Sequence, residues 1–270
     1  MNDKLSSLPD ARPSSTVLLA RGGSSGPEIL MVERHRDVAF GATYAFPGGV
    51  LETADVAARA FCQGLDDHAA SDCLGVASNG LDYYSAAIRE LFEETGVLLA
   101  RHGDGRWAFA KPQVDQDALC RLRERYVSGA ERWEELLAAN ALHLAVDVLN
   151  YVSHWETPII RAKRFSTRFF VTELPPGQAV QHDGVEIVDS QWLRPANALR
   201  LGESGEIKLP FPTTRTLQQI AAFETVSELM TWARKRNAAL IQCVRPVVIA
   251  GKNGFRITIP GDPDYPGDDR

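Results

Sequence analysis

The stretch that decides the fold is Arg89-Glu90-Leu91-Phe92-Glu93-Glu94-Thr95-Gly96-Val97. On a helix, Glu90, Glu93 and Glu94 share one face, because residues three and four apart are neighbours. The opposite face is apolar and follows the i, i+3, i+4, i+7 pattern of a buried stripe; it comprises Ile88, Leu91, Phe92 and Thr95. The pattern predicts a helix over about 83–95, capped by Asp82 and ended by Gly96, with a strand at 97–100 after it.

The three glutamates predict a cation site on this helix. Like charges at this spacing repel each other by about a few tenths of a kcal/mol per pair, and a cation placed among them removes that cost. Clustered carboxylate oxygens suit hard divalent ions such as Mg²⁺ or Mn²⁺. Arg89 lies one turn before Glu93 and is placed to hold that carboxylate in position. The alternative is an ordinary solvated acidic face.

A tight turn upstream favours the cation site. Phe46-Pro47-Gly48-Gly49 ends a short strand, and its glycines allow a backbone carbonyl or amide to approach a metal or a phosphate closely. With this turn, the chain resembles the Nudix hydrolase family, whose signature is G-x5-E-x7-R-E-U-x-E-E-x-G-U, where U is a bulky aliphatic residue. Gly49 takes the first glycine of the signature, and the Arg89 stretch matches its second half.

The resemblance implies a set of roles at the matching positions. Glu90, Glu93 and Glu94 would bind the divalent ions and serve in catalysis with Arg89, and the carbonyl of Gly49 would add a metal ligand. It further implies an α/β/α sandwich with a mixed β-sheet. The irregular mixture of strands and helices in the chain favours the same architecture over a doubly wound parallel sheet.

Two departures from the signature concern its first half. Asp55, a shorter carboxylate, occupies the first glutamate position, and residues 56–88 separate it from Arg89 where the signature has x7. We therefore expect an insertion at about 56–80 with at most one short helix, which costs little stability because loop-closure entropy grows slowly with length. The role of Asp55 is open, and Glu52 is a rival for it.

The split signature resembles the branch of the family that includes the peroxisomal coenzyme A diphosphatases. Arg34 upstream, Trp155-Glu156-Thr157-Pro158 and the run from Glu186 to Pro195 contribute to this likeness. Glu186 is a further candidate to bind metal, orient water or bind substrate, with a loop-edge carboxylate as the alternative. The candidate substrate-binding residues are Arg34, Arg168, Gly48 and Phe46, with Arg36 and Arg164 as further possible phosphate clamps, because guanidinium groups match phosphate oxygens.

Composition sets outer limits on function. The chain has 270 residues and a formal net charge of −6, which argues against nonspecific nucleic-acid binding. Its four cysteines, Cys62, Cys73, Cys120 and Cys243, form no C-x-x-C pair, so neither a zinc site nor a disulfide framework is expected. We see neither a signal peptide nor an apolar run that could span a membrane, and we expect a cytoplasmic protein without a membrane partner.

The chain is expected to form one unit. We predict a flexible tail at 1–14, a single domain at 15–260 and a short tail at 261–270. Within the domain, a helical segment at about 115–140 is a candidate lid or homodimer contact, or else a solvated face. A helix-plus-strand extension occupies about 205–260, with one helix at 213–236 and a final strand pair at 244–249 and 255–259.

The expected activity is divalent-metal-dependent hydrolysis of a diphosphate linkage in a nucleotide-derived small molecule. The branch resemblance points to coenzyme A or an acyl-CoA. ADP-ribose and NADH are alternatives within the same class, and a non-catalytic nucleotide sensor of the same fold is an alternative from another class.

Overall fold

The computed structural model describes residues 10–34, 43–111, 114–181, 187–251 and 254–266. A mixed β-sheet forms its middle layer, in the order β10-β2-β1-β9-β8-β11, with β3 paired to β2 and β4 paired to β1. The pairs β1–β9 and β8–β11 are parallel, and the other pairs of this sheet are antiparallel. These strands are β1 Arg12–Gly23, β2 Gly26–Arg34, β3 Tyr44–Ala45, β4 Gly48–Val50, β8 Asn150–Glu156, β9 Phe165–Glu173, β10 Ile187–Leu193 and β11 Cys243–Val244.

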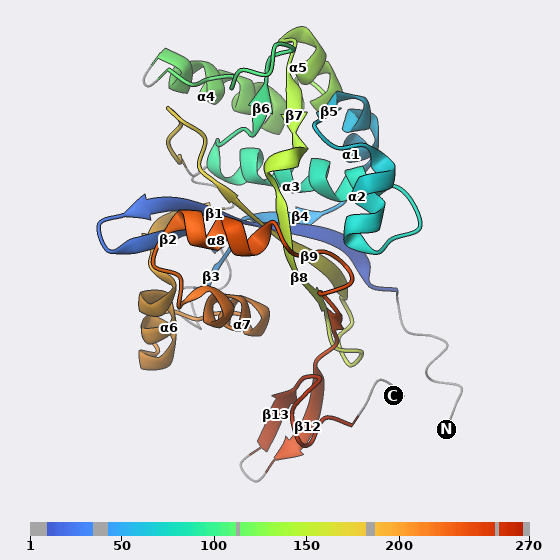
Figure 1. Ribbon diagram of the computed structural model, residues 1–270, viewed down its shortest axis with the longest axis vertical. Helices are drawn as coiled ribbons and strands as arrows, with labels where there is room; N and C mark the ends of the chain where they lie inside the picture. The colour runs from blue at the N-terminus through green and yellow to red at the C-terminus, as the bar shows by residue number, and fades with distance from the viewer. Residues whose placement is uncertain (1–9, 35–42, 112–113, 182–186, 252–253, 267–270) are drawn as a thin grey trace.

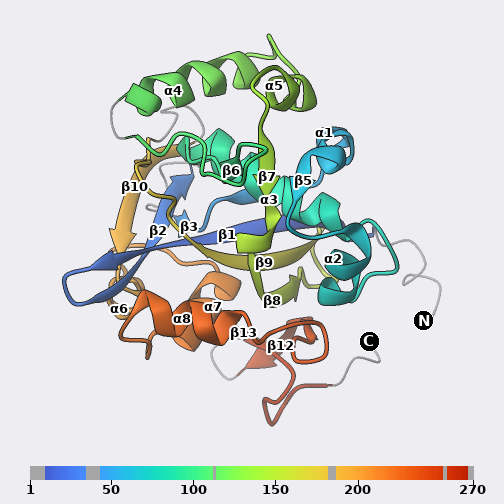
Figure 2. The same ribbon diagram turned by 45° about the horizontal axis from the view of Figure 1, so that its top comes forward.

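Helices cover both faces of this sheet (Figures 1 and 2). One face carries α1 Thr53–Ala57, α2 Asp67–Leu74, α3 Gly80–Thr95, α4 Val114–Val127 and α5 Trp133–Ala139, and the other carries α6 Pro195–Ser204, α7 Phe211–Ile220 and α8 Val226–Ala233. The predicted α/β/α sandwich with a mixed sheet is therefore confirmed. No helix within the described ranges is both long and apolar enough to span a bilayer.

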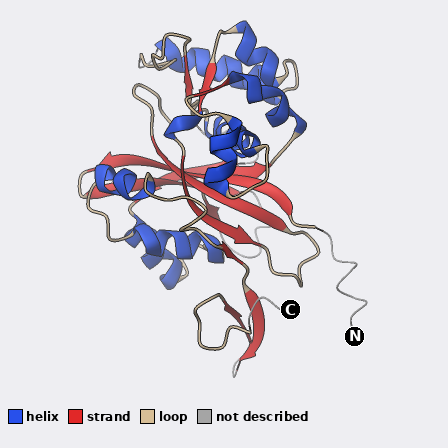
Figure 3. Ribbon diagram, turned by 45° about the vertical axis from the view of Figure 1, so that its right-hand side comes forward, coloured by secondary structure: helices blue, strands red, loops and turns tan. Residues whose placement is uncertain are grey.

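Two small sheets lie outside the main one, as the strands coloured in Figure 3 show. The first joins β5 Cys62–Gln63, β7 His143–Ala145 and β6 Ala100–Arg101, and the second is the hairpin of β12 Val247–Gly251 and β13 Gly254–Thr258. Two 3₁₀ helices, Ala58–Phe61 and Val146–Val148, complete the described elements. The hairpin corresponds to the predicted final strand pair, although β11 before it joins the main sheet instead.

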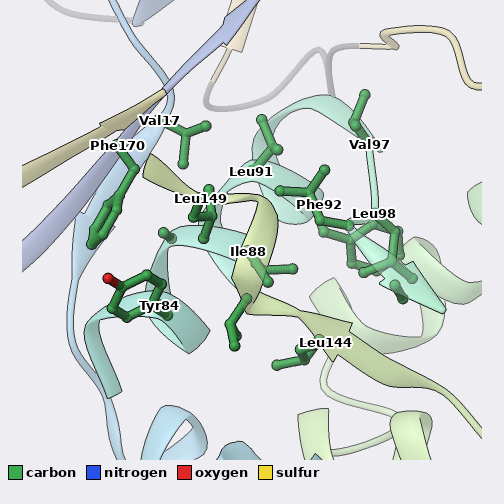
Figure 4. Packing of buried hydrophobic residues seen from close by; sticks show 14 of the residues in the cluster. Val17, Tyr84, Ile88, Leu91, Phe92, Val97, Leu98, Leu144, Leu149 and Phe170 are labelled. Carbon is green, nitrogen blue, oxygen red and sulfur yellow. The ribbon is translucent and has the colours of Figure 1, made fainter. Parts of the chain in front are cut away.

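The core is divided between the two faces of the sheet. On the α3 side, Leu91 and Phe92 are fully buried, and the ring of Tyr84 packs against that of Phe170 of β9, with 4.7 Å between the ring centroids and an interplanar angle of 52° (Figure 4). Alternate residues of β1 serve the two faces, with Val17 toward α3 and Leu18 toward α6–α8. The apolar stripe predicted for the helix is thus the surface that anchors α3 to the sheet.

The insertion contains more regular structure than predicted. The expectation of at most one short helix is wrong, because α1 runs on into a 3₁₀ helix and α2 follows it. Two local signals mark α2: the side chain of Asp66 accepts a hydrogen bond from Ala69 N, and Gly75 ends the helix at φ 65°. Gly80 then begins α3 so close to α2 that a Cβ there would lie 2.3 Å from Ser71 N.

Several predicted boundaries also change. Asn79, rather than Asp82, is the N-cap of α3, and Asp82 instead accepts hydrogen bonds from Arg59. Of the strand expected at 97–100 only the last residue pairs, because the Gln178 side chain bonds both Leu98 N and Leu98 O. The helix expected at 213–236 is divided into α7 and α8.

The remaining differences lie at the N-terminus and between α7 and α8. The side chain of Thr225 caps a new helix start by accepting from Glu228 N. β1 begins at Arg12, inside the segment predicted as a tail at 1–14. All four cysteines are free thiols.

Candidate active site

The site forms where the acidic face of α3 meets β4. Gly48 pairs with Thr16 of β1, and a Cβ on Gly48 would lie 2.2 Å from Ser15 O. Gly48 also has φ 151°, a conformation that side-chain-bearing residues rarely adopt. Its N–H donates to Oε2 of Glu94 at 3.2 Å. The turn therefore approaches the helix so closely that only glycine fits.

Gly49 makes a second close approach to the same helix. A Cβ on Gly49 would lie 2.2 Å from Oε1 of Glu90, a separation that no real side chain tolerates. The backbone of β4 is consequently in direct contact with the Glu90 carboxylate. The predicted proximity of Gly48 and Gly49 to the glutamates is present in the structure.

Arg89 holds the carboxyl groups together. Its Nη1 donates to Oε1 of Glu90 at 3.0 Å and to Oε1 of Glu93 at 2.8 Å, as expected for a residue one turn before Glu93. Its Nε and Nη2 donate to the two oxygens of Asp55 at 2.9 and 3.0 Å, and Nη2 also donates to Val50 O. The carboxyl groups of Asp55, Glu90 and Glu93 thus share one guanidinium group.

The structure places Asp55 and Glu52 differently. Asp55 is fully buried beneath Arg89 and also accepts hydrogen bonds from Glu52 N and Ser85 Oγ. Glu52 is exposed as the N-cap of α1 and lines the cleft described below. Asp55 therefore positions Arg89 from behind, and Glu52 is the carboxylate at the surface.

Burial and mutual contact shift the pKa values of Asp55 and Arg89. Burial raises the pKa of Asp55, and the hydrogen bonds and positive charge of Arg89 oppose that rise. For Arg89, burial lowers the pKa, but the hydrogen bonds and charge of Asp55, joined by Glu90 and Glu93, outweigh it and raise the pKa above its usual value. The guanidinium group consequently stays protonated and orders the carboxylates around it.

Helix α4 supports the far end of the cluster. Nε of Arg123 donates to Glu93 O at 2.7 Å, and Nη1 donates to Gln181 O at 2.6 Å. Burial together with the negative charge of Glu93 raises the pKa of Tyr126. The backbone of Glu93 is thus held from α4, and Tyr126 of the same helix lies near its carboxylate.

An open cleft of about 470 Å³ lies over these groups. Its size falls within the range typical of small-molecule sites. The residues lining it come from β1, β4, the N-cap of α1, α3 and β9; they are Arg12, Ser14, Thr16, Gly48, Gly49, Val50, Glu52, Arg89, Glu90, Glu93, Phe165 and Thr167. Glu94 is 4% exposed and contacts the cleft floor through Gly48 N.

The donor set of the cleft fits a hard divalent cation. Within the described ranges, no three His, Cys, Asp or Glu side chains already converge on one metal position. Glu90 and Glu93 nevertheless both line the cleft, side by side on Arg89. Carboxylate and backbone carbonyl oxygens are the ligands that Mg²⁺ and Mn²⁺ prefer. Glu90, Glu93, Glu94 and the Gly49 carbonyl could therefore hold such an ion.

Some predicted residues lie elsewhere. Phe46 is 2% exposed and packs edge-on against Phe169 in the core, so the structure does not bring it to the cleft. Arg168 is buried with its guanidinium 4.2 Å above the Tyr83 ring, on the α3 side of β9. Arg164 forms an ion pair with Glu156. These positions argue against phosphate binding by the two arginines.

Three other predictions cannot be placed. Glu186 and Arg36 lie outside the described residues. Arg34 ends β2 opposite Ile187, and its side chain is outside the described part of the chain.

Arg12, Ser14 and Thr167 line the cleft although their sequence pattern did not predict it. The Oγ of Ser14 lies 2.6 Å from Oγ1 of Thr167 across the parallel pair β1–β9. β1 and β9 are far apart in the chain, so no local sequence pattern indicates that they pair in parallel. Arg12 was assigned to the predicted tail.

Comparison with known proteins gives a consistent result. The model of the NUDT19 Nudix domain matches residues 61–220. The acyl-coenzyme A diphosphatase NUDT19 of Xenopus laevis is 28% identical over 191 residues, covering 67% of this chain and 50% of that protein. The Homo sapiens protein of the same name is 29% identical over 209 residues, covering 74% of this chain and 55% of that protein. The chain therefore spans about half the length of these two curated relatives.

A solved structure supports the fold. The crystal structure of a NUDIX hydrolase from Alicyclobacillus acidocaldarius superposes with a TM-score of 0.63 at 25% identity, covering 82% of this chain and 96% of that one.

Proposed function

The chain belongs to the NUDT19 Nudix domain family, and on that premise we propose that it is a divalent-metal-dependent hydrolase that cleaves the diphosphate linkage of coenzyme A or an acyl-CoA. The observation that carries the proposal is the Arg89-centred cluster of carboxylates at the floor of an open cleft, in contact with Gly48 and Gly49. The names of the curated relatives support coenzyme A compounds as the substrate class.

Some residues of the cluster would bind the metal ion, and others hold those residues in position. Glu90, Glu93 and Glu94, with the Gly49 carbonyl, would hold Mg²⁺ or Mn²⁺. The bound ion would neutralise charge on the diphosphate and lower the pKa of a water. Arg89, fixed by Asp55 beneath it, keeps the carboxylates of Glu90 and Glu93 oriented toward the cleft. This arrangement fits a reaction that develops negative charge on phosphate oxygens.

A carboxylate at the cleft surface would take the proton of the attacking water. The side chain of Glu93 is 30% exposed and that of Glu90 is 13% exposed, so both are accessible from the cleft. Arg89 donates a hydrogen bond to Glu93 and so fixes the position of that carboxylate. Glu186 stays a further candidate for this role.

Product release from a substrate panel tests the proposal. We would incubate the purified chain with coenzyme A, acetyl-coenzyme A, ADP-ribose, NADH and diadenosine polyphosphates, each with Mg²⁺, with Mn²⁺ and with a chelator. We expect coenzyme A and its acetyl ester to be cut to adenosine 3′,5′-bisphosphate and the corresponding phosphopantetheine, and the reaction to stop with the chelator. Cleavage of ADP-ribose or NADH alone would contradict the substrate class. Tight binding without cleavage of any compound would indicate a sensor.

A further inference from the structure

One arginine of the cleft has no role in the cluster of carboxylates. Within the described ranges, two cationic side chains line the cleft, Arg12 of β1 and Arg89 of α3. A diphosphate substrate brings negative charge to a cleft that already contains the carboxylates of Glu90 and Glu93. Bound metal ions and basic side chains both offset such charge. The hydrogen bonds of the two arginines therefore decide which of them can hold a phosphate.

Arg89 has no N–H left for a substrate. A guanidinium group carries five N–H donors. Nε and Nη2 of Arg89 donate to Asp55, and Nη2 also donates to Val50 O. Nη1 donates to Glu90 and to Glu93. These bonds use all of the donors, so Arg89 orders acceptors of the protein itself and cannot bind a phosphate without releasing one of them.

Arg12 has all of its guanidinium donors available. Its side chain is exposed and makes neither a hydrogen bond nor an ion pair in the part of the chain that the structure describes. Its backbone is fixed, because Arg12 N donates to Arg164 O at 2.9 Å and the next residue, Pro13, accepts from Leu51 N at 3.1 Å. The start of β1 is thus anchored on both sides, and it presents an unpaired cation to the cleft.

Hydroxyl groups continue the same wall from Arg12 toward the carboxylates. Residues two apart on a strand share a face, so Arg12, Ser14 and Thr16 lie on one side of β1, and all three line the cleft. Ser14 pairs with Thr167 of the adjacent β9, and their hydroxyl oxygens lie 2.6 Å apart (Figure 2). One hydroxyl donates to the other, so the pair keeps one O–H for a ligand. Thr16 pairs with Gly48 in the turn beside the glutamates.

We infer that Arg12, together with the hydroxyl pair of Ser14 and Thr167, binds a phosphate group of the substrate. The inference rests on the proposed function and adds to it the residues that orient the substrate in the cleft. A guanidinium group matches phosphate oxygens with two parallel N–H donors, and a hydroxyl supplies a further donor. Coenzyme A offers such oxygens at its diphosphate linkage and at the 3′-phosphate of its ribose.

Charge-removing substitutions at two exposed arginines test the inference. Arg12→Gln removes the cation from the cleft, whereas Arg12→Lys keeps the charge without the planar fork. Arg121→Gln is the matched control, because Arg121 is exposed on α4, lies outside the cleft lining and loses the same charge. Each protein would be tested with coenzyme A and with 3′-dephospho-coenzyme A. Calorimetry with a chelator present would give Kd, and initial rates with Mg²⁺ at low and high salt would give KM and kcat.

We expect Arg12→Gln to raise Kd and KM for coenzyme A about tenfold or more, to change kcat less and to leave the melting temperature unchanged. Arg12→Lys should recover part of the loss, and high salt should reduce the difference from the unsubstituted protein, because salt screens an exposed contact between a cation and a phosphate. Arg121→Gln should affect neither compound. A loss for coenzyme A alone would assign the contact to the 3′-phosphate, and an equal loss for both compounds would assign it to the diphosphate.

Two results would overturn the inference. In the first, Kd and KM of Arg12→Gln equal those of Arg121→Gln for both compounds. In the second, Arg12→Lys recovers nothing and salt has no influence, as expected for a purely structural role. Weaker binding by Arg12→Gln in a chain that cleaves neither compound would support the phosphate contact and refute the proposed hydrolysis. Absence of both binding and cleavage in the unsubstituted protein would refute both proposals.

Discussion

Arg89 donates two parallel hydrogen bonds to Asp55, from Nε to Oδ1 at 2.9 Å and from Nη2 to Oδ2 at 3.0 Å. Both side chains are almost completely buried, with 1% and 0% of their surfaces exposed. The pair connects the start of the insertion to the helix that carries the glutamates. Its geometry explains how the aspartate at the first acidic position of the signature contributes to the site without reaching the cleft.

Removal of the Asp55 charge should destabilise the fold. Asp55→Asn leaves the buried guanidinium without its bidentate partner, and we expect the free energy of unfolding to fall by about 3 kcal/mol. Denaturant unfolding followed by circular dichroism measures the change. Asp104→Asn is the matched control, because Asp104 pairs with Arg106 at the surface, and it should leave the unfolding midpoint where it is. An unchanged midpoint for Asp55→Asn as well would show that the buried pair does not hold the helix.

A single methyl group at Gly49 should disable the site. In Gly49→Ala the new Cβ would overlap the Glu90 carboxylate, so Glu90 must move and we expect turnover to fall roughly 10²-fold. Gly22→Ala is a suitable control, because no atom lies within 4 Å of a Cβ at that position. Turnover and thermal melting of the two variants separate a local effect from unfolding. Full activity of Gly49→Ala would mean that contact between β4 and Glu90 has no catalytic importance.

Neutralising Glu93 should abolish activity and preserve the fold. We expect Glu93→Gln to lower turnover by about two orders of magnitude or more, since the side chain is proposed to bind metal or accept a proton. The variant should also need a higher Mg²⁺ concentration for half-maximal rate. Glu124→Gln, on the exposed side of α4, provides the comparison. Near-normal turnover of Glu93→Gln would falsify the assignment of this glutamate.

Stability should decline in mild acid because of His154. Burial, with the positive charges of Arg168 and Arg245, lowers the pKa of His154 from 6.5 to about 3, and its Nε2 lies 2.7 Å from Oγ of Ser166. Between these two pKa values the unfolded chain binds a proton that the folded chain does not. The contribution of the neutral histidine is therefore complete above pH 6.5 and is lost as the pH falls toward 3, at up to about 1.4 kcal/mol per pH unit.

Unfolding measured at pH 7 and pH 5 tests this expectation. His154→Gln, which can keep a hydrogen bond to Ser166, should reduce the difference between the two pH values. His68→Gln should not, because His68 has a side chain that is 87% exposed. The same pH dependence in all three proteins would assign the acid sensitivity to other groups.

The local pattern of the sequence was sufficient to predict helix α3 and the character of its two faces. Periodicity, a C-cap glycine and the spacing of Arg89 from Glu93 are properties of neighbouring residues, and they predicted the buried stripe, the acidic face and the contact between these two side chains. The same reasoning predicted the helical segment at about 115–140. It overlooked Asp66 and Gly75, whose local signals mark α2.

Tertiary structure decided which other residues join the site. Asp55 meets Arg89 only because the insertion folds back on itself, and Thr167 joins Ser14 only because β9 pairs with β1. Phe46 and Arg168 were both predicted to bind substrate, yet the sheet turns their side chains into the interior. The face of a strand on which a side chain lies depends on its pairing register, and a shift of one residue reverses it. Local sequence therefore determined the chemistry of the helix, whereas long-range strand pairing determined the walls of the cleft around it.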